Sequence, residues 1–498
     1  MEEPSAAGRR VPRKRKEAER PKRKKAAARK APSRPAPDYL VHETDNDMLL
    51  IISNVGQERE QPPKRRRLGK KPQRLPRKRA PRGGGRKKGG APGAKKAAFR
   101  GPEAGKAPAT HTGRAPGSAW GEQLPVEILV RIFQPVVSSE GAVPFLCRVA
   151  RVCRLWYGAD SNPVLWQKVS VGFCWVAPGL KQPPATEKKI LGTVAWLVAD
   201  RFSLLRDFAL CHWKNHVPFV LKAVSDSCPL LSSLSLCHCS RVDTESLHAL
   251  AERCPQLESL NLQNSQVSSS AVVSFLEAAG SRIRQLLLTY SGQMNAIITT
   301  LASGCCPRLQ LLEVTTELKQ SSQHFQLPIE QLQTACPRLQ VLRLLNVIWS
   351  PKPIPRSAPA SPGFPQLQEL CLATTSYSFI DDGVLQRMLQ ASSQLRILDL
   401  RGCFRVTPKG LETLPCPDLE QLYLGLYCSA NHLRLPLEGS PLLTRKWRQS
   451  LQELDLAGQS FSEHDLEEAM ECFTQGGGEV ALRSLNLTGT KVTLGTVR

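Results

Sequence analysis

The stretch LSSLSLCHC, residues 231–239, carries the pattern L-x-x-L-x-L, and the same pattern returns in LESLNL, residues 257–262. The first five copies begin at residues 205, 231, 257, 283 and 309, which are four successive steps of 26. Chance does not hold one period over four steps, so this part of the chain is an internal repeat. The remaining copies, which bring the total to eleven, begin at residues 339, 367, 395, 419, 451 and 482.

Each copy is expected to form a strand followed by a helix. The two apolar residues of L-x-L point to the same side of a strand, and the segment TESLHALAERC, residues 244–254, spaces its apolar residues as one face of a helix. Cys239 and Cys403 each follow the last strand leucine by three residues. The predicted fold class is therefore an α/β solenoid, a Cys-type leucine-rich-repeat array of about eleven repeats over residues 193–498.

The sixteen cysteines fit this repeat better than they fit disulfides. Cys228 and Cys254 lie one period apart, and Cys306 lies three periods from Cys228. The N-terminus has no apolar signal-peptide region, so we expect an intracellular chain with reduced thiols. The runs CHC at 237–239 and CC at 305–306 have no second ligand pair at zinc spacing, so neither a metal nor a cofactor is predicted.

Residues 1–118 hold 34 Lys and Arg against 11 Asp and Glu, a net charge of +23, whereas the rest of the chain is nearly neutral at +2. Such a segment buries too little apolar surface to offset its ordering entropy, so we predict a disordered tail. Its basic clusters favour nuclear import and allow weak, non-specific nucleic-acid binding, although a polycation that only improves solubility has the same composition. The residues predicted as import signals are Arg13, Lys14, Arg15, Lys16, Lys22, Arg23, Lys24, Lys25, Lys64, Arg65, Arg66 and Arg67.

Other segments interrupt these regions. The island DYLVHETDNDMLLIISN, 38–54, is either a short partner-binding segment or a mere interruption of the tail. A Pro-containing linker is predicted over 171–192, and two long loops are predicted within the array, at 346–365 and 425–450. No apolar run approaches the ~18 residues of a membrane span, so no membrane contact is predicted.

A small helical block, 119–170, separates the tail from the array. The stretch LPVEILVRIFQ, 124–134, has the spacing of an amphipathic helix with Pro125 in its first turn. A second helix is predicted over PFLCRVARVCRLWYG, 144–158, with Val152 on its apolar face. A block this small carries more apolar surface than it can bury alone. The surplus either meets a permanent partner or packs on the first repeat, and periodicity does not decide between the two.

The order LPxEILxxIF, VCRxW and PxLW in this block resembles an F-box, except that the connection QPVVSSEGAV between the first two helices is longer. An F-box followed by Cys-type repeats resembles the F-box/leucine-rich-repeat family. The resemblance implies a substrate receptor of an SCF-type cullin–RING ubiquitin ligase. Its F-box would dock on the linker subunit, and through it on the cullin and RING subunits, while the repeats hold an unknown protein substrate. The implied linker contacts, or their support, are Leu124, Pro125, Ile128, Leu129, Ile132, Phe133, Val152, Cys153, Trp156 and Trp166.

Strand residues that alternate with core positions are expected to face the concave side of the array. This face reads as apolar in its middle, with acidic and paired charges later. We predict that it binds substrate, although a loop such as 346–365 could instead fold over the apolar residues. The predicted substrate-binding residues are Leu287, Leu311, Glu313, Val341, Arg343, Leu345, Ile397, Asp399, Arg401 and Tyr423.

An enzyme is not expected. The sequence has no G-x-x-x-x-G-K-[ST] loop, no H-E-x-x-H pair and no nucleophile elbow. We predict a non-catalytic receptor subunit, nuclear or cytoplasmic with the nucleus favoured. The alternative is a ligase-independent nuclear scaffold whose tail binds nucleic acid or an acidic partner. Salt distinguishes them, because polycation binding collapses with salt and apolar docking does not.

Overall fold

The computed structural model describes most of the chain beyond the tail. Within residues 1–123 it describes only strands β1 (Val41–His42) and β2 (Leu50–Ile51), which pair antiparallel. The predictions for the tail, for its basic clusters and for most of the island 38–54 lie outside the described residues. The described ranges are 41–42, 50–51, 124–172, 184–316, 325–354, 361–375, 377–426, 437–474 and 481–493.

The first folded block is made of short helices that end in a strand. Its first helix begins after Pro125 but runs through Pro135, so most of the predicted connection 134–143 is helical. Pro135 lies on the exposed side, where water can satisfy the carbonyl that loses its donor. Gly141, with φ of 88°, ends the helix. The elements of the block are α2 (Val126–Glu140), α3 (Ala142–Val149), α4 (Arg154–Asp160), η1 (Pro163–Trp166) and β3 (Lys168–Val171).

The prediction of one helix over 144–158 is wrong, because the chain breaks between α3 and α4. Cys153 has extended backbone angles and precedes α4. The break lets two aromatic rings reach the same partner: the ring centroid of Phe133 lies 5.5 Å from that of Phe145 and 5.3 Å from that of Trp156. In a continuous helix, two residues eleven positions apart are separated by about 16 Å, too far for both to touch one ring.

The block joins the array directly. Strand β3 pairs in parallel with β4 (Asp207–Cys211), with Lys168 opposite Asp207 and Val171 opposite Leu210. The segment predicted as a linker, 171–192, is therefore only partly a connection, since helix α5 already begins at Pro184. Residues 173–183 lie outside the described residues.

The array is a solenoid with a 12-stranded parallel sheet, which confirms the predicted fold class. All eleven L-x-x-L-x-L copies form strands of this sheet, and β3 is the twelfth. Equivalent leucines of successive repeats, such as Leu234, Leu260, Leu286 and Leu312, lie directly opposite one another and are buried. After β4 the strands are β5 (Ser233–Cys237), β6 (Ser259–Asn261), β7 (Gln285–Thr289), β8 (Leu311–Thr315), β10 (Val341–Leu345), β12 (Glu369–Cys371), β13 (Ile397–Asp399), β14 (Gln421–Tyr423), β15 (Glu453–Asp455) and β16 (Ser484–Asn486).

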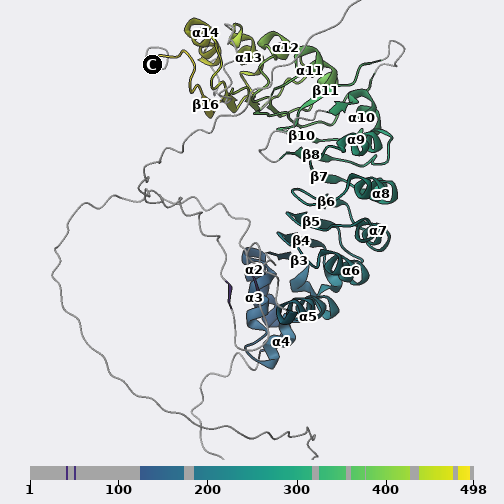
Figure 1. The fold of residues 1–498 in the computed structure, drawn as a ribbon. Helices are drawn as coiled ribbons and strands as arrows, with labels where there is room; N and C mark the ends of the chain where they lie inside the picture. Colours follow the sequence, from purple (N-terminus) through teal and green to yellow (C-terminus); the bar gives the residue numbers. More distant parts are fainter. Residues whose placement is uncertain are drawn as a thin grey trace, which may run out of the picture. The chain divides into compact units, whose positions relative to one another are not determined.

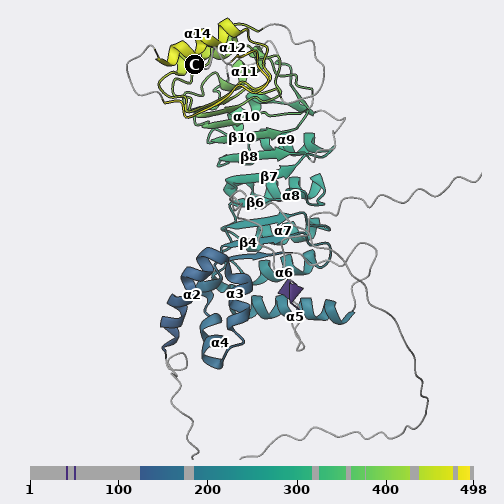
Figure 2. The ribbon, with the colours of Figure 1, turned by 90° about the vertical axis from the view of Figure 1, so that its left-hand side faces the viewer.

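Helices follow the strands and stack on one side of the sheet, as Figure 1 shows for α6 to α10 and Figure 2 shows from a second direction. No described helix is both long enough and apolar enough to cross a membrane. The helices are α5 (Pro184–Asp200), α6 (Val217–Ser227), α7 (Thr244–Arg253), α8 (Ser269–Ala279), α9 (Met294–Ala302), α10 (Ile329–Ala335), α11 (Asp382–Leu389), α12 (Pro408–Glu412), α13 (Ser440–Trp447) and α14 (Glu463–Thr474), with short turns η2 (Phe202–Leu204) and η3 (Gly280–Arg282).

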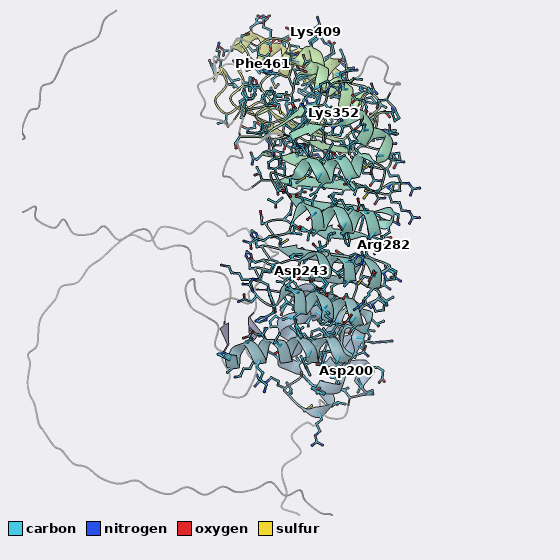
Figure 3. The ribbon with its side chains drawn as sticks, turned by 45° about the vertical axis from the view of Figure 1, so that its right-hand side comes forward. Asp200, Asp243, Arg282, Lys352, Lys409 and Phe461 are labelled. Carbon is cyan, nitrogen blue, oxygen red and sulfur yellow. The ribbon has the colours of Figure 1, made fainter. Side chains whose placement is uncertain are left out.

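Local hydrogen bonds set where each repeat turns from strand to helix. The Asp243 carboxylate, labelled in Figure 3, accepts from the Ser246 N–H at 2.8 Å and caps the N-terminus of α7. The Cys239 thiol donates to the Leu210 carbonyl of the preceding repeat at 3.1 Å, and Cys403 makes the same bond to Leu372 at 3.5 Å. Cysteine at this motif position therefore ties neighbouring repeats together.

The two predicted long loops contain regular structure. Strand β11 (Trp349–Pro351) of the first pairs in parallel with β9 (Phe325–Leu327). In the second, 425–450, helix α13 was not predicted. It forms because Trp447 is fully buried and donates its indole N–H to the Cys416 carbonyl at 2.8 Å.

Candidate functional site

The helical block presents an apolar face to solvent. Ile128 and Ile132 lie one helical turn apart on α2 and are 41% and 48% exposed. Val152, in the break between α3 and α4, is 61% exposed. Tyr157 on α4 and Val164 in η1 are also exposed. These five exposed residues, Ile128, Ile132, Val152, Tyr157 and Val164, come from α2, the break after α3, α4 and η1, and are together called the exposed apolar face below.

The ten residues predicted as linker contacts or their support separate into two groups. The first group is buried or half-buried and holds the block together. The second is exposed and could touch a partner. The buried or half-buried residues are Leu124, Leu129, Phe133, Cys153, Trp156 and Trp166, and the exposed ones are Pro125, Ile128, Ile132 and Val152.

Tyr157 and Val164 are exposed apolar residues that the sequence reasoning missed. Val164 lies inside the PxLW motif, so its position was available as a signal. Tyr157 had no such signal, because its environment is set by Arg201 and Trp196 from a later helix. Hydrogen bonds from Trp196 and Arg201 lower the pKa of the Tyr157 hydroxyl.

A buried ion pair fixes the block to the array. Arg201, just after α5, donates from Nε and Nη2 to Asp160 Oδ2 at 3.1 and 2.9 Å, and both side chains are fully buried. The guanidinium lies 3.8 Å from the ring centroid of Trp196, and the Trp166 indole donates to the Asp160 carbonyl at 2.6 Å. Burial raises the pKa of Asp160 to about 6, while Arg201 acts in the opposite direction. A desolvated ion pair of this kind holds one geometry, because separating the two groups would leave a buried charge without a counter-charge.

Aromatic rings continue this junction into the sheet. The ring centroids of Trp166 and Phe202 are 6.0 Å apart, and those of Phe202 and Phe208 are 6.2 Å apart. Phe208 belongs to β4, so the apolar core runs without interruption from η1 into the first strands. The exposed apolar face is therefore held at a fixed position relative to the first repeats.

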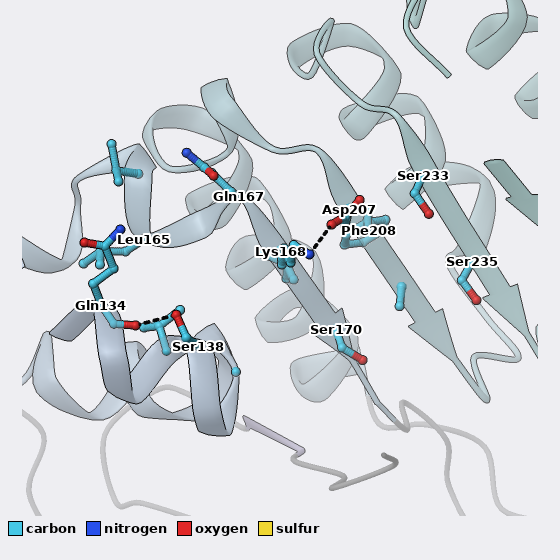
Figure 4. A pocket seen from close by; sticks show the side chains of 15 residues that line it. Gln134, Ser138, Leu165, Gln167, Lys168, Ser170, Asp207, Phe208, Ser233 and Ser235 are labelled. Atoms are coloured by element: carbon cyan, nitrogen blue, oxygen red, sulfur yellow. Dashed lines mark hydrogen bonds and ion pairs between the residues drawn. The ribbon is translucent and has the colours of Figure 1, made fainter. Parts of the chain in front are cut away.

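A cavity of about 430 Å³ opens where the block meets the sheet (Figure 4). Gln134 and Ser138 of α2 line one side, and Lys168 bridges to Asp207 at 3.2 Å across the floor. The other lining residues include three serines, Ser170, Ser233 and Ser235, and apolar residues such as Leu165 and Phe208. A segment bound along the first strands would thus reach the helical block.

The predicted substrate residues lie on the strand face, defined here as the sheet side chains that point away from the core. Leu287, Leu311, Val341, Leu345 and Ile397 are half-buried. Leu311 and Val341 lie directly opposite one another, whereas Glu369 separates Val341 from Ile397. Leu287 is paired with Glu313, and Leu345 with Thr315. The structure therefore brings two of the five together, and charged or polar residues separate the rest.

Charged networks occupy the remaining predicted positions. Arg343 donates to Glu313 at 2.9 Å and to both carboxylate oxygens of Glu369, and these hydrogen bonds raise the pKa of Arg343. Asp399 accepts two hydrogen bonds from Arg401, at 2.9 and 2.6 Å.

Tyr423 completes the second of these networks. Its ring lies 5.3 Å from the Arg401 guanidinium, and its hydroxyl donates to Glu453 at 2.6 Å. Burial and the Glu453 carboxylate raise the pKa of this hydroxyl.

The described parts of the loop 346–365 lie against the helices. The Lys352 N–H donates to the Leu327 carbonyl at 2.9 Å, and Gln390 donates to the Ser361 carbonyl at 2.8 Å. These contacts place Lys352 beside β9 and Ser361 beside the C-terminal end of α11. Residues 355–360 lie outside the described residues.

Most cysteine thiols are unsuited to nucleophilic chemistry. Burial raises the pKa of Cys228, Cys336 and Cys403 to about 12, and that of Cys254 to about 11. A thiol with such a pKa is almost wholly protonated at neutral pH. Across the described ranges, no group of three or more His, Cys, Asp or Glu side chains is arranged to hold a metal ion.

Comparison with known proteins agrees with the helical block. A family model described as F-box-like matches residues 122–171. No curated protein sequence matches the chain. Among solved structures, the chain resembles one from a crystal structure of the yeast Rad7 and Elc1 complex, at 14% identity over 74% of this chain and 83% of that chain, with a TM-score of 0.34. It also resembles the leucine-rich repeat domain of APL1B, at 13% identity over 63% of this chain and 83% of that chain, with a TM-score of 0.29. The chain consists of an F-box-like domain followed by leucine-rich-repeat-like α/β repeats.

Proposed function

We propose that the chain is the substrate-recognition subunit of an SCF-type cullin–RING ubiquitin ligase. The exposed apolar face of the F-box-like domain carries this proposal. It would bind the linker subunit, and through it the cullin and RING subunits, because burying exposed apolar side chains against a partner is favourable. The repeats would hold the protein to be ubiquitinated on the strand face, and the chain itself would do no chemistry.

The architecture supports this role because a receptor must hold two partners in a fixed relation. The Asp160–Arg201 pair and the continuous aromatic core lock the F-box-like domain to the first repeats. Transfer to a bound protein depends on positioning, which a rigid scaffold supplies better than a flexible tether does.

The test is binding of the purified linker subunit to the full chain at low and at moderately high salt. Ile128→Asp and Ile132→Asp place a carboxylate on the exposed apolar face without touching the core. Each is expected to weaken binding at least about a hundredfold, which corresponds to about 2.7 kcal/mol. Phe219→Asp is the matched control, because Phe219 on α6 is 41% exposed, as Ile128 is, but lies in the repeats. Equal binding by all four proteins would remove the proposal.

The second candidate is a ligase-independent nuclear scaffold, which the net charge of +23 on residues 1–118 favours. In that case the clusters at 13–16, 22–25 and 64–67 would serve nuclear import and phosphate contact. Binding to nucleic acid or to an acidic partner would then fall steeply as salt rises. Linker binding that resists salt and is lost in Ile132→Asp favours the receptor, whereas salt-sensitive binding that survives this substitution favours the scaffold.

A further inference from the structure

A second exposed apolar cluster lies far along the repeats from the F-box-like domain. Tyr377, Phe379 and Phe404 are 40%, 38% and 37% exposed. The ring centroid of Tyr377 lies 4.9 Å from that of Phe379 and 5.7 Å from that of Phe404. The Arg405 guanidinium lies 5.3 Å from the Tyr377 ring and 5.9 Å from the Phe404 ring, and it donates to the Tyr377 hydroxyl. Tyr377, Phe379, Phe404 and Arg405 are called the aromatic patch below.

The repeat itself does not require these rings. The run Cys403-Phe404-Arg405-Val406 has the same place in its repeat as Cys239-Ser240-Arg241-Val242 has in an earlier one. In both runs the cysteine and the valine are buried and serve the core. The earlier repeat folds with a serine where the later one has Phe404. An aromatic ring at an exposed position that tolerates serine points to a role other than folding.

The aromatic patch rests on a rigid frame. Its residues come from two consecutive connections, β12 to α11 and β13 to α12. The Asp382 carboxylate joins these connections by accepting from the Thr407 N–H at 2.8 Å and from the Thr407 hydroxyl at 2.7 Å. Ser378 and Ile380, which flank Phe379, are buried. The rings are thus held in place before any partner arrives, which lowers the entropy cost of binding.

The charge of the patch indicates what it can bind. Among the described residues, no Asp or Glu oxygen lies within the 4.0 Å ion-pair distance of Arg405. Asp381, whose backbone bridges to that of Arg405, and its neighbour Asp382 already accept hydrogen bonds at the starts of α11 and α12. Lys409, labelled in Figure 3, is exposed in the first turn of α12. A guanidinium held against aromatic rings presents its remaining donors to a carboxylate in two-point geometry.

We propose that the aromatic patch docks an acidic peptide segment of a protein partner, in which an Asp or Glu lies near a large apolar side chain. The carboxylate pairs with Arg405, and the apolar side chain packs on the rings of Tyr377, Phe379 and Phe404. Tyrosine and arginine are the residues that most often dominate such contacts. Identifying this partner with the substrate rests on the proposed function, whereas the docking itself does not.

Single-stranded nucleic acid is the other ligand that aromatic rings and arginine can bind. The surroundings disfavour it. The patch and the first turn of α12 offer one arginine and one lysine, Arg405 and Lys409. A phosphate backbone needs several cations to bind tightly.

The experiment selects short random peptides displayed on phage against the full chain at moderate salt. Arg405→Gln and Phe404→Ser are the patch variants, and Phe404→Ser recreates the residue order of the earlier repeat, so it is expected to fold. Arg241→Gln is the matched control, since Arg241 is exposed at the equivalent position beside Ser240. All four proteins carry the same basic tail, so its contribution to peptide binding cancels in the comparison.

The expected result is enrichment of peptides that combine Asp or Glu with an aromatic or aliphatic residue. Fluorescent copies should bind both patch variants at least about tenfold more weakly than the parent and should bind Arg241→Gln unchanged. Failure to enrich, enriched peptides without a carboxylate, or equal affinity for all variants would overturn the proposal. An oligo(dT) probe that loses affinity in the patch variants while the peptides do not would reassign the surface to nucleic acid. Linker-subunit binding, measured on the same proteins, reports separately on the proposed function.

Discussion

The buried pair between Asp160 and Arg201 makes a quantitative prediction about how firmly the F-box-like domain is attached. Arg201→Met removes the cation but keeps a long side chain against Trp196. The Asp160 carboxylate, which is fully buried, then loses the cation that it is paired with. Its other oxygen, Oδ1, has no hydrogen-bond partner among the described residues and so cannot compensate for the loss. Leaving one member of a buried pair uncompensated costs about 3–5 kcal/mol of unfolding free energy.

The loss is expected to depend on pH. Burial raises the pKa of Asp160 to about 6 in the parent chain, above the ~4 of an unfolded aspartate, and removing Arg201 raises it further. A carboxyl group whose folded pKa exceeds its unfolded pKa loses stability as pH rises between the two values. The loss of stability at pH 7.5 should therefore exceed the loss at pH 5. At pH 5 Asp160 is largely protonated in both proteins, and about 1–2 kcal/mol should remain, from the lost cation–π contact with Trp196.

Urea unfolding followed by tryptophan fluorescence measures this directly, because Trp166 and Trp196 lie beside the pair. Asp160→Asn combined with Arg201→Met is the control, since it removes both charges and should lose less stability than Arg201→Met alone. An equal loss at pH 5 and pH 7.5, or a double variant as unstable as the two single changes added together, would refute the reasoning.

Three further predictions concern other parts of the chain. Phe133→Ala leaves a cavity in the core of the F-box-like domain, so it should lower the free energy of unfolding in urea by about 3–5 kcal/mol and abolish linker binding. The surface change Ile132→Asp, by contrast, should leave the free energy of unfolding within about 0.5 kcal/mol of the parent value. Gly402→Ala should destabilise the later repeats by more than about 1 kcal/mol, because φ is 84° at this position and a Cβ would collide with the Thr374 carbonyl. Hydrogen exchange measures this destabilisation, and unchanged exchange rates in these repeats would contradict it. Iodoacetamide at pH 8 should label half-exposed Cys237 well before buried Cys228, as measured by peptide mass spectrometry. Equal labelling rates would contradict the burial of the Cys228 thiol in the core of the repeats.

The strands were the most predictable part of the fold. Leucines at a constant period require no knowledge of distant residues, because the strand of each repeat pairs with the strands of the adjacent repeats. The same holds for α2, whose apolar spacing and Pro125 mark its start. The exposure of Ile128 and Ile132 does not follow from this helix, since Ile132 lies three positions from buried Leu129 and so shares a face with it.

The missed features depend on contacts between residues far apart in the chain. The helical periodicity continues across the break at 150–153, and only the need for Phe145 and Trp156 to reach one ring explains it. The Asp160–Arg201 pair joins residues 41 positions apart, with no local signal. Helix α13 is flanked by turn-forming residues, and its formation depends on burial of Trp447, whose indole N–H donates to the Cys416 carbonyl, 31 residues earlier. Tertiary packing overrode the local pattern in each case.

Strand β3 has a consequence for solubility. A parallel sheet exposes unpaired N–H and C=O groups along its outermost strand, and such an edge is a template for pairing with another chain. Here β3 covers the edge of β4, and the Asp207 N–H donates to the Gln167 carbonyl at 3.0 Å. A fragment that contained only the repeats would leave β4 uncovered and should aggregate. The F-box-like domain thus supplies the strand that covers β4, so its removal would disturb more than partner binding.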